Sequence, residues 1–196
     1  MADAGRVIAG TARGTRLLAP GPGTRPLGDR VKQTLFGILD PELAGAAVLD
    51  LFAGSGAGGI EALSRGASRA VFVERDAGAA RVIGENLRRA GLAGPAATVV
   101  RRDAIAWLAG GAGDAGPFDL VLVDPPYDDA ESMRRALDLV GPLVTPGGRV
   151  VAKHFWRTPP PARVGMLATE RERRFGETAL TFYRRAEPVH EEDDAG

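Results

Sequence analysis

The 196-residue chain contains no cysteine and only two histidines, His154 and His190. The absence of cysteine excludes disulfide frameworks, thiolate zinc sites and cysteine nucleophiles. Two histidines are too few for most metal clusters, so we expect no metal site. No apolar run approaches the roughly 20 residues of a membrane span, and the first residues lack the apolar core of a signal peptide. We therefore expect a cytoplasmic protein that does not associate with membranes.

Opposite charges cancel in the total but are unevenly distributed along the chain. Residues 1–36 carry six basic groups against two acidic ones, whereas residues 187–196 are acidic. A basic segment of this kind favours a polyanionic partner. We expect a basic N-terminal arm over residues 1–27 with a possible short hairpin, one main domain over 28–186, and a disordered acidic tail over 187–196. We expect a monomer.

The middle of the chain alternates short apolar runs with segments of helical periodicity. This alternation predicts an α/β fold, a doubly wound and mostly parallel sheet of seven strands that ends in an antiparallel hairpin. The expected strands span residues 46–52, 70–74, 97–100, 118–123, 149–155, 163–174 and 178–185, and the expected helices span 28–39, 59–65, 77–90, 104–108 and 130–140.

A glycine-rich segment, residues 50–59 with the sequence DLFAGSGAGG, follows the first strand of the alternation. Ligands of open α/β sheets bind outside the carboxyl ends of the strands, where this segment is expected to lie. The glycines fit two patterns. Gly54-x-Gly56-x-x-Gly59 matches the dinucleotide fingerprint, and Gly54-x-Gly56-x-Gly58 matches the loop of methyltransferases that use S-adenosylmethionine. The glycines alone do not choose between these ligands.

Acidic residues follow the next strands as well. Glu74 ends the second strand, where a carboxylate can accept hydrogen bonds from ribose hydroxyls of either ligand. Asp103 follows the third strand and could contact an adenine amino group or cap a helix. The tetrapeptide Asp124-Pro-Pro-Tyr127 follows the fourth strand. Two prolines are more than a strand terminator requires, so this corner indicates a built binding site.

The chain resembles class I methyltransferases that modify exocyclic amines. The resemblance lies in three features that occur in the same order: the segment 50–56, Asp103 and the tetrapeptide that begins at Asp124. The segments 6–14, 25–36, 56–67 and 175–183 resemble the RsmD family, which methylates N2 of a guanine in bacterial 16S ribosomal RNA. The resemblance covers roughly residues 5–185 and implies a Rossmann-like class I methyltransferase fold with S-adenosylmethionine as the cofactor. The chain departs from the family at Leu27-Gly28, usually Thr-Thr, and at Gly59, usually a larger apolar residue. The second departure should weaken a helix start by up to about 1 kcal/mol relative to alanine.

The resemblance also implies roles for individual residues. Asp124 and the Pro125 carbonyl would accept hydrogen bonds from the two N–H groups of the target amine. Pro126 would stiffen the turn, and Tyr127 would stack on the base. The small ribosomal subunit would be the partner, with Lys153, His154 and Arg157 as further RNA candidates, although packing is favoured for His154 and for Trp107 and Trp156. The candidates for cofactor binding are Asp50, Phe52, Gly54, Ser55, Gly56, Gly58, Glu74, Arg75, Asp103 and Ala104, and those for RNA binding are Arg6, Arg13, Arg16, Arg25 and Arg30.

Three other functions remain open at this point. An NAD-dependent oxidoreductase would satisfy the glycines and Glu74, but no tyrosine–lysine pair or suitable histidine stands at a strand end. An amine methyltransferase for DNA adenine or protein glutamine more often carries asparagine where Asp124 stands. A non-catalytic RNA-binding module would leave the acidic residues of the expected pocket without a purpose.

Overall fold

Strands and helices alternate from residue 47 onward in the computed structural model, which describes residues 3–21, 28–110 and 112–186. The apolar, β-branched runs form the strands because both faces of a parallel sheet are covered. The strands are β1 (Asp3–Arg6), β2 (Arg16–Leu18), β3 (Ala47–Leu51), β4 (Arg69–Glu74), β5 (Ala97–Arg101), β6 (Phe118–Val123), β7 (Val144–Phe155), β8 (Arg163–Val164), β9 (Leu167–Phe175) and β10 (Thr178–Arg185).

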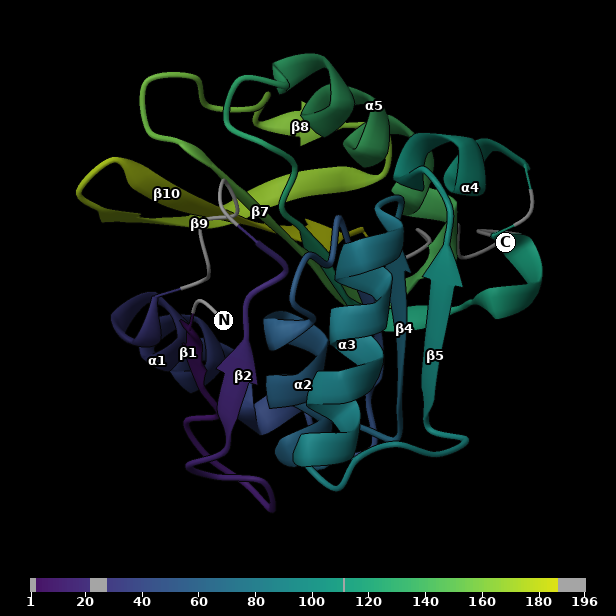
Figure 1. The fold of residues 1–196 in the computed structure, drawn as a ribbon. Helices are drawn as coiled ribbons and strands as arrows, with labels where there is room; N and C mark the ends of the chain where they lie inside the picture. Colours follow the sequence, from purple (N-terminus) through teal and green to yellow (C-terminus); the bar gives the residue numbers. More distant parts are fainter. Residues whose placement is uncertain (1–2, 22–27, 111, 187–196) are drawn as a thin grey trace, which may run out of the picture.

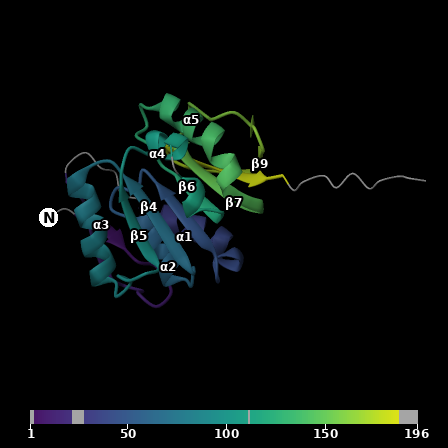
Figure 2. The ribbon, with the colours of Figure 1, turned by 90° about the vertical axis from the view of Figure 1, so that its right-hand side faces the viewer.

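Helices cover both faces of the main sheet (Figures 1 and 2). The first three pack their apolar sides on one face, and the last two pack on the other, so the core is divided into two clusters. The helices are α1 (Asp29–Leu39), α2 (Ala57–Ser64), α3 (Ala77–Arg89), α4 (Ala104–Gly110) and α5 (Ala130–Val140), with 3₁₀ turns η1 (Asp40–Glu42), η2 (Gly113–Ala115) and η3 (Gly141–Leu143).

The strand order β5-β4-β3-β6-β7-β10-β9-β8 confirms the doubly wound fold with an antiparallel C-terminal hairpin. The chain runs outward from β3 to β5 and then returns to β6 on the other side of β3. At this switch point the connections leave toward opposite faces, so a crevice opens beyond the carboxyl ends of β3 and β6.

The sheet has eight strands in the described residues, so the expected count of seven was wrong. The segment expected as one strand over 163–174 is divided by a turn at Gly165-Met166, where Gly165 has a φ of 54°. Val164 then pairs with Leu167, and the two-residue β8 forms the sheet edge. A left-handed glycine reverses the chain here although the flanking residues are typical of strands.

The N-terminal segment is fixed to the main domain through buried polar groups. Glu61 of α2 is fully buried, and its two carboxylate oxygens accept the Ile8 and Ala9 amides at 2.8 and 3.0 Å. Asn86 of α3 is also fully buried and exchanges two hydrogen bonds with the Leu18 backbone. Removal of this segment would take these hydrogen bonds away from two buried polar side chains, which is costly.

Helix α1 is capped by Gly28 and begins at Asp29, whose carboxylate lies 3.3 Å from the Arg6 guanidinium. Arg25, Leu27 and the acidic tail over 187–196 lie outside the described residues. Across the described ranges, every helix is too short or too polar to cross a membrane.

The two helical glycines Gly59 and Gly84 give a matched test of packing against helix propensity. A Cβ at Gly59 would lie 2.3 Å from the ring of Phe72, which is fully buried, so the close approach of α2 to β4 requires glycine. We expect Gly59→Ala to lower the free energy of unfolding by about 1–2 kcal/mol, because overpacking outweighs the gain in helix propensity.

A Cβ at Gly84 of α3 would meet no heavy atom within 4 Å. We therefore expect Gly84→Ala to raise the free energy of unfolding by about 0.5–1 kcal/mol. Urea denaturation measures both variants, and stabilisation by Gly59→Ala would contradict the packing argument.

Candidate active site

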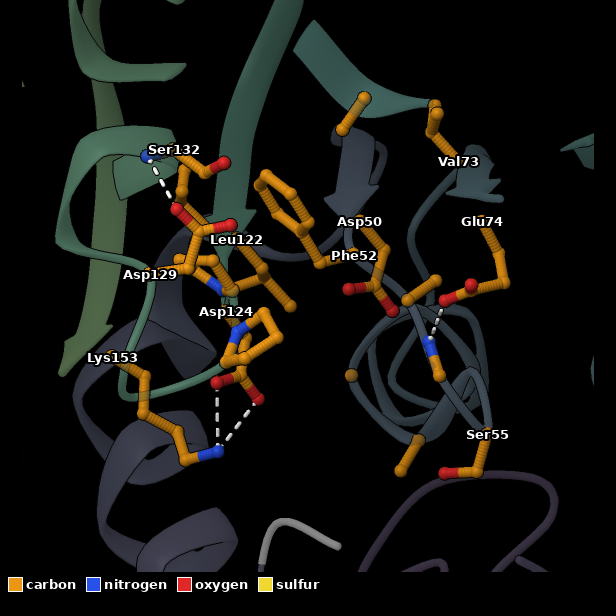
Figure 3. A pocket seen from close by; sticks show the side chains of 18 of the residues that line it. Asp50, Phe52, Ser55, Val73, Glu74, Leu122, Asp124, Asp129, Ser132 and Lys153 are labelled. Carbon is orange, nitrogen blue, oxygen red and sulfur yellow. Dashed lines mark hydrogen bonds and ion pairs between the residues drawn. The ribbon is translucent and has the colours of Figure 1, made fainter. Parts of the chain in front are cut away.

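A cavity of about 590 Å³ opens at the carboxyl ends of β3, β4 and β6, at the topological switch point (Figure 3). This volume falls within the range of small-molecule sites. The cavity is lined by all four residues of the Asp124–Tyr127 corner and by every cofactor candidate except Gly56. The fold therefore brings together segments that lie up to about 75 residues apart in the chain.

The first turn after β3 is strained. Phe52 has a φ of 59°, a left-handed conformation that non-glycine residues adopt rarely. The turn is held by two hydrogen bonds, from the Ala53 amide to the Val73 carbonyl and from the Gly54 amide to the Glu74 carboxylate. Around Gly54, a Cβ would find only the Phe52 carbonyl, 3.9 Å away, so the space above this backbone is open to a ligand.

The other glycines of the loop serve packing within the protein. Gly56 has a φ of 75° and caps α2, and a Cβ there would lie 3.1 Å from Ile83 of α3. At Gly58 a Cβ would lie 2.6 Å from Leu122. Gly56 thus faces α3 rather than the cavity, and the structure does not place it with the other cofactor candidates.

Glu74 and Asp103 occupy the two outer strand ends of the cavity. Glu74 accepts the Gly54 amide with Oε2 and the Asp76 amide with Oε1, both at 2.8 Å. Asp103 accepts the Ala106 amide at 2.9 Å, so it caps α4 while lining the cavity, and the two alternatives considered for it are compatible. Each of these oxygens has a second lone pair, so both carboxylates can still accept hydrogen bonds from a ligand.

Asp50 lies at the centre of the cavity wall, with a relative exposure of 5%. Its Oδ2 accepts the Gly59 amide at 2.8 Å. Burial raises the pKa of Asp50 to about 7, and the nearby carboxylates of Asp124 and Glu74 add to the rise. A cationic ligand group in this cavity would therefore meet a carboxyl that ionises near neutral pH.

Lys153 on β7 is paired with Asp124, an interaction that the sequence did not predict. Its ammonium lies 2.7 Å from both carboxylate oxygens of Asp124, and its side chain is about 10% exposed (Figure 3). Burial raises the pKa of Asp124, and the Lys153 charge opposes that rise. Lys153, expected as an RNA-binding candidate, is thus buried and paired inside the site.

Two neighbours complete the corner. The Tyr127 hydroxyl lies 2.6 Å from Thr178 Oγ1, and the Lys153 ammonium lies 5.3 Å from the centre of the Tyr127 ring. His154 is buried, and its ring nitrogens bond the Phe155 carbonyl and Thr181. This burial agrees with the packing role favoured for His154.

The N-terminal arginines do not converge on the cavity. Arg6 and Arg16 are exposed and form ion pairs with Asp29 and Asp3. Arg13 is also exposed and follows Ala12, whose amide bonds Ser64 at the far end of α2 from the cavity. Arg30 is exposed on the first turn of α1. None of these four arginines lines the cavity. In the described part of the chain, no group of three histidine or carboxylate side chains could hold a metal ion.

This fold and this cavity define a class I methyltransferase, the class that uses S-adenosylmethionine. The donor set fits that cofactor: a carboxylate beyond β4 for the ribose, a carboxylate and an amide beyond β5 for the adenine, and an open backbone with Asp50 for the amino acid part.

Residues 5–184 match the family described as Conserved hypothetical protein 95, and the chain belongs to this family, the RsmD family of methyltransferases. The chain is 37% identical over 183 residues to the YlbH protein of Bacillus subtilis, covering 92% of this chain and 98% of that one. It is 44% identical over 123 residues to ribosomal RNA small subunit methyltransferase D of Escherichia coli, covering 62% of this chain and 60% of that protein. The solved structure of the Escherichia coli yhhF protein superimposes with a TM-score of 0.79 at 34% identity, over 93% of this chain and 98% of that one.

The raised pKa of Asp50 predicts a pH-dependent stability. A carboxyl group with a higher pKa in the folded state than in the unfolded state makes its full contribution to stability at a pH below its unfolded pKa, near 4. This contribution is lost as the pH rises through the folded pKa of about 7. We expect the wild type to lose stability relative to Asp50→Asn between pH 5 and pH 8 in the absence of cofactor. Urea denaturation across this range measures the difference, and parallel curves for the two proteins would contradict the raised pKa.

Proposed function

We propose that this protein transfers a methyl group from S-adenosylmethionine to the exocyclic N2 amine of a guanine in 16S ribosomal RNA of the small ribosomal subunit. The observation that carries the proposal is the position of the Asp124–Tyr127 corner, which shares one cavity with the glycine loop and Asp50. The family membership and the small-subunit activity named for the Escherichia coli relative support the choice of substrate. Such a substrate would place the enzyme in the cytoplasm.

The proposed chemistry addresses a weak nucleophile. The lone pair of an aromatic exocyclic amine is delocalised into its ring, so attack requires the nitrogen to become more tetrahedral. The Asp124 carboxylate and the Pro125 carbonyl would accept hydrogen bonds from the two N–H groups of the amine. The Pro126 carbonyl already accepts a hydrogen bond from the Asp129 amide at 3.0 Å. Such positioning is worth effective molarities of about 10⁵ M or more. When bound, S-adenosylmethionine supplies a sulfonium methyl group as the electrophile.

Lys153 adds a constraint to this chemistry. Its charge opposes the rise in the pKa of Asp124 and so favours the carboxylate form, in which both oxygens are acceptors. The pair is neutral overall, and the positive charge that develops on the amine nitrogen faces the carboxylate. After transfer, the nitrogen returns to neutrality by losing one proton, for which the Asp124 carboxylate is the acceptor within the corner.

The remaining residues position the two substrates. Tyr127, held by Thr178, would stack on a base extruded from the RNA, and extrusion costs a few kcal/mol. Glu74 would hold the ribose hydroxyls, and Arg75 would pack beside the adenine. Asp103 and the Ala104 amide would read the adenine edge, while Phe52, Ser55 and Gly54 would frame the amino acid part.

Incubation of the protein with labelled S-adenosylmethionine and unmethylated 30S subunits, followed by mapping of the modified nucleotide, tests the proposal. We expect 2-methylguanosine at one position of 16S ribosomal RNA. Modified adenine in DNA or modified glutamine in protein would favour the other amine methyltransferases. Calorimetric binding of NADH without binding of S-adenosylhomocysteine would favour an oxidoreductase.

Asp124→Asn tests the acceptor role without a change in size. We expect methyl transfer to fall about 10²- to 10³-fold, as when one aligned electrostatic group is removed from an active site. The affinity for S-adenosylhomocysteine, measured by calorimetry, should stay within about threefold of wild type if cofactor binding rests on the other strand ends. Asp128→Asn, which alters a second carboxylate lining the same cavity, serves as the matched control. Full activity of Asp124→Asn would refute the mechanism.

Lys153→Met tests the role of the ion pair. Loss of the ammonium raises the pKa of Asp124 beyond its already raised value, because burial is then unopposed. The reaction needs the carboxylate form, so the acidic limb of the rate profile should move to higher pH. Lys153→Arg retains the charge and should keep the limb near that of wild type. The single-turnover rate from pH 6 to pH 9 measures the limb, and identical profiles for both variants would rule out this role.

A further inference from the structure

An aromatic row extends outward from the Asp124–Tyr127 corner along the carboxyl end of β7. The rings of Tyr127 and Phe155 have centroids 6.4 Å apart, and Phe155 and Trp156 repeat this spacing. Unlike the buried Trp107, Trp156 is only partly buried. The row therefore begins inside the site and reaches the surface.

Two exposed arginines lie against the outer end of this row. The guanidinium carbon of Arg174 lies 3.5 Å from the centre of the Trp156 ring, and that of Arg157 lies 5.0 Å away. Arg174 comes from the end of β9 and Arg157 from the segment after β7, so the β9–β10 hairpin completes the cluster. This hairpin extends beyond the helical layers at the left of Figure 1.

A second cavity, of about 210 Å³, lies beside the same corner. Its walls include Tyr127, Phe155, Met133 and the three prolines 159–161, and its rim includes Arg134 and Asp129. The Asp129 carboxylate caps α5 through the Ser132 amide, and Arg134 pairs with acidic neighbours on α5. Lys153 also lines this cavity but is paired with Asp124. We therefore expect the positive charge that meets a phosphate to come from Arg157 and Arg174 rather than from the residues that line the cavity.

We infer that this region, here called the flanking site, binds the RNA nucleotides next to the methylated base. It comprises the second cavity, the row Tyr127–Phe155–Trp156 and the two arginines. A flanking base would enter the cavity lined by rings and prolines, and Arg157 and Arg174, oriented by the indole, would contact the phosphates. Aromatic rings and guanidinium planes that follow one another beside positive charge are typical of single-stranded RNA binding. The inference rests on the proposed function, because only an RNA substrate carries flanking nucleotides.

The geometry favours this site over the N-terminal arm for contacts near the target. β7 runs parallel to β6, so Phe155 and Asp124 end at the same edge of the sheet. Arg13 lies instead by the far end of α2. An extruded base in the corner would thus leave its neighbours in the strand beside the row.

The test compares two double variants that remove equal charge. Arg157→Ala with Arg174→Ala alters the flanking site, while Arg88→Ala with Arg89→Ala alters two exposed arginines in the last turn of α3, away from the corner. Binding of a short single-stranded oligoribonucleotide and methylation of unmethylated 30S subunits are measured for both. We expect the first variant to raise the Kd and the KM about tenfold or more, with kcat unchanged. The salt slope of its RNA affinity should shrink by about 0.7 per lost phosphate contact.

Trp156→Ala separates orientation from charge, because it retains both arginines. We expect a rise in the Kd for the oligoribonucleotide without loss of S-adenosylhomocysteine binding, which also shows that the variant is folded. Equal RNA affinity of the flanking-site variant and its control would overturn the inference whatever the methylation assay gives. Failure of the wild type to methylate 30S subunits would instead overturn the proposed function, and the oligoribonucleotide comparison would still decide the flanking site.

Discussion

The divergence of the chain at the β3–β6 switch point is the constraint on which the rest of the structure depends. Neighbouring parallel strands that send their connections to opposite faces cannot close the space beyond their carboxyl ends. The four acidic residues singled out for the site stand at such ends, from Asp50 on β3 to Asp124 after β6. The chemistry therefore follows from topology, and the segments that carry it need no proximity in the sequence.

Close packing around the glycine loop keeps this crevice in shape. Gly58 lets α2 approach Leu122 of β6, and Gly59 lets it approach Phe72 of β4. The helix thus starts directly above the sheet, and the amide of its third residue reaches the Asp50 carboxylate. Of the glycines whose pattern suggests a ligand-binding loop, Gly58 and Gly59 are therefore needed for packing of the helix on the sheet, whereas Gly54 borders the open space of the cavity.

Electrostatics then divide the cavity into two parts. On the side of β3, Asp50 has no described cation within ion-pair distance, and its pKa is raised to about 7. On the side of β6, Asp124 is only partly buried and is paired with Lys153. The two carboxylates therefore differ in their electrostatic surroundings, as the roles proposed for them in cofactor binding and in binding of the target amine require.

The sequence alone determined the order of strands and helices and the positions of Asp50, Glu74, Asp103 and Asp124 at strand ends, because hydrophobic periodicity and turn residues are local signals. It did not show the turn at Gly165, since a two-residue strand leaves no periodic pattern. Only the tertiary structure decided the partners of charged side chains. Lys153 reads as a surface cation beyond an apolar run, yet pairing of β6 with β7 places it against Asp124, 29 residues away. Such pairing depends on distances across the sheet, which no local pattern records.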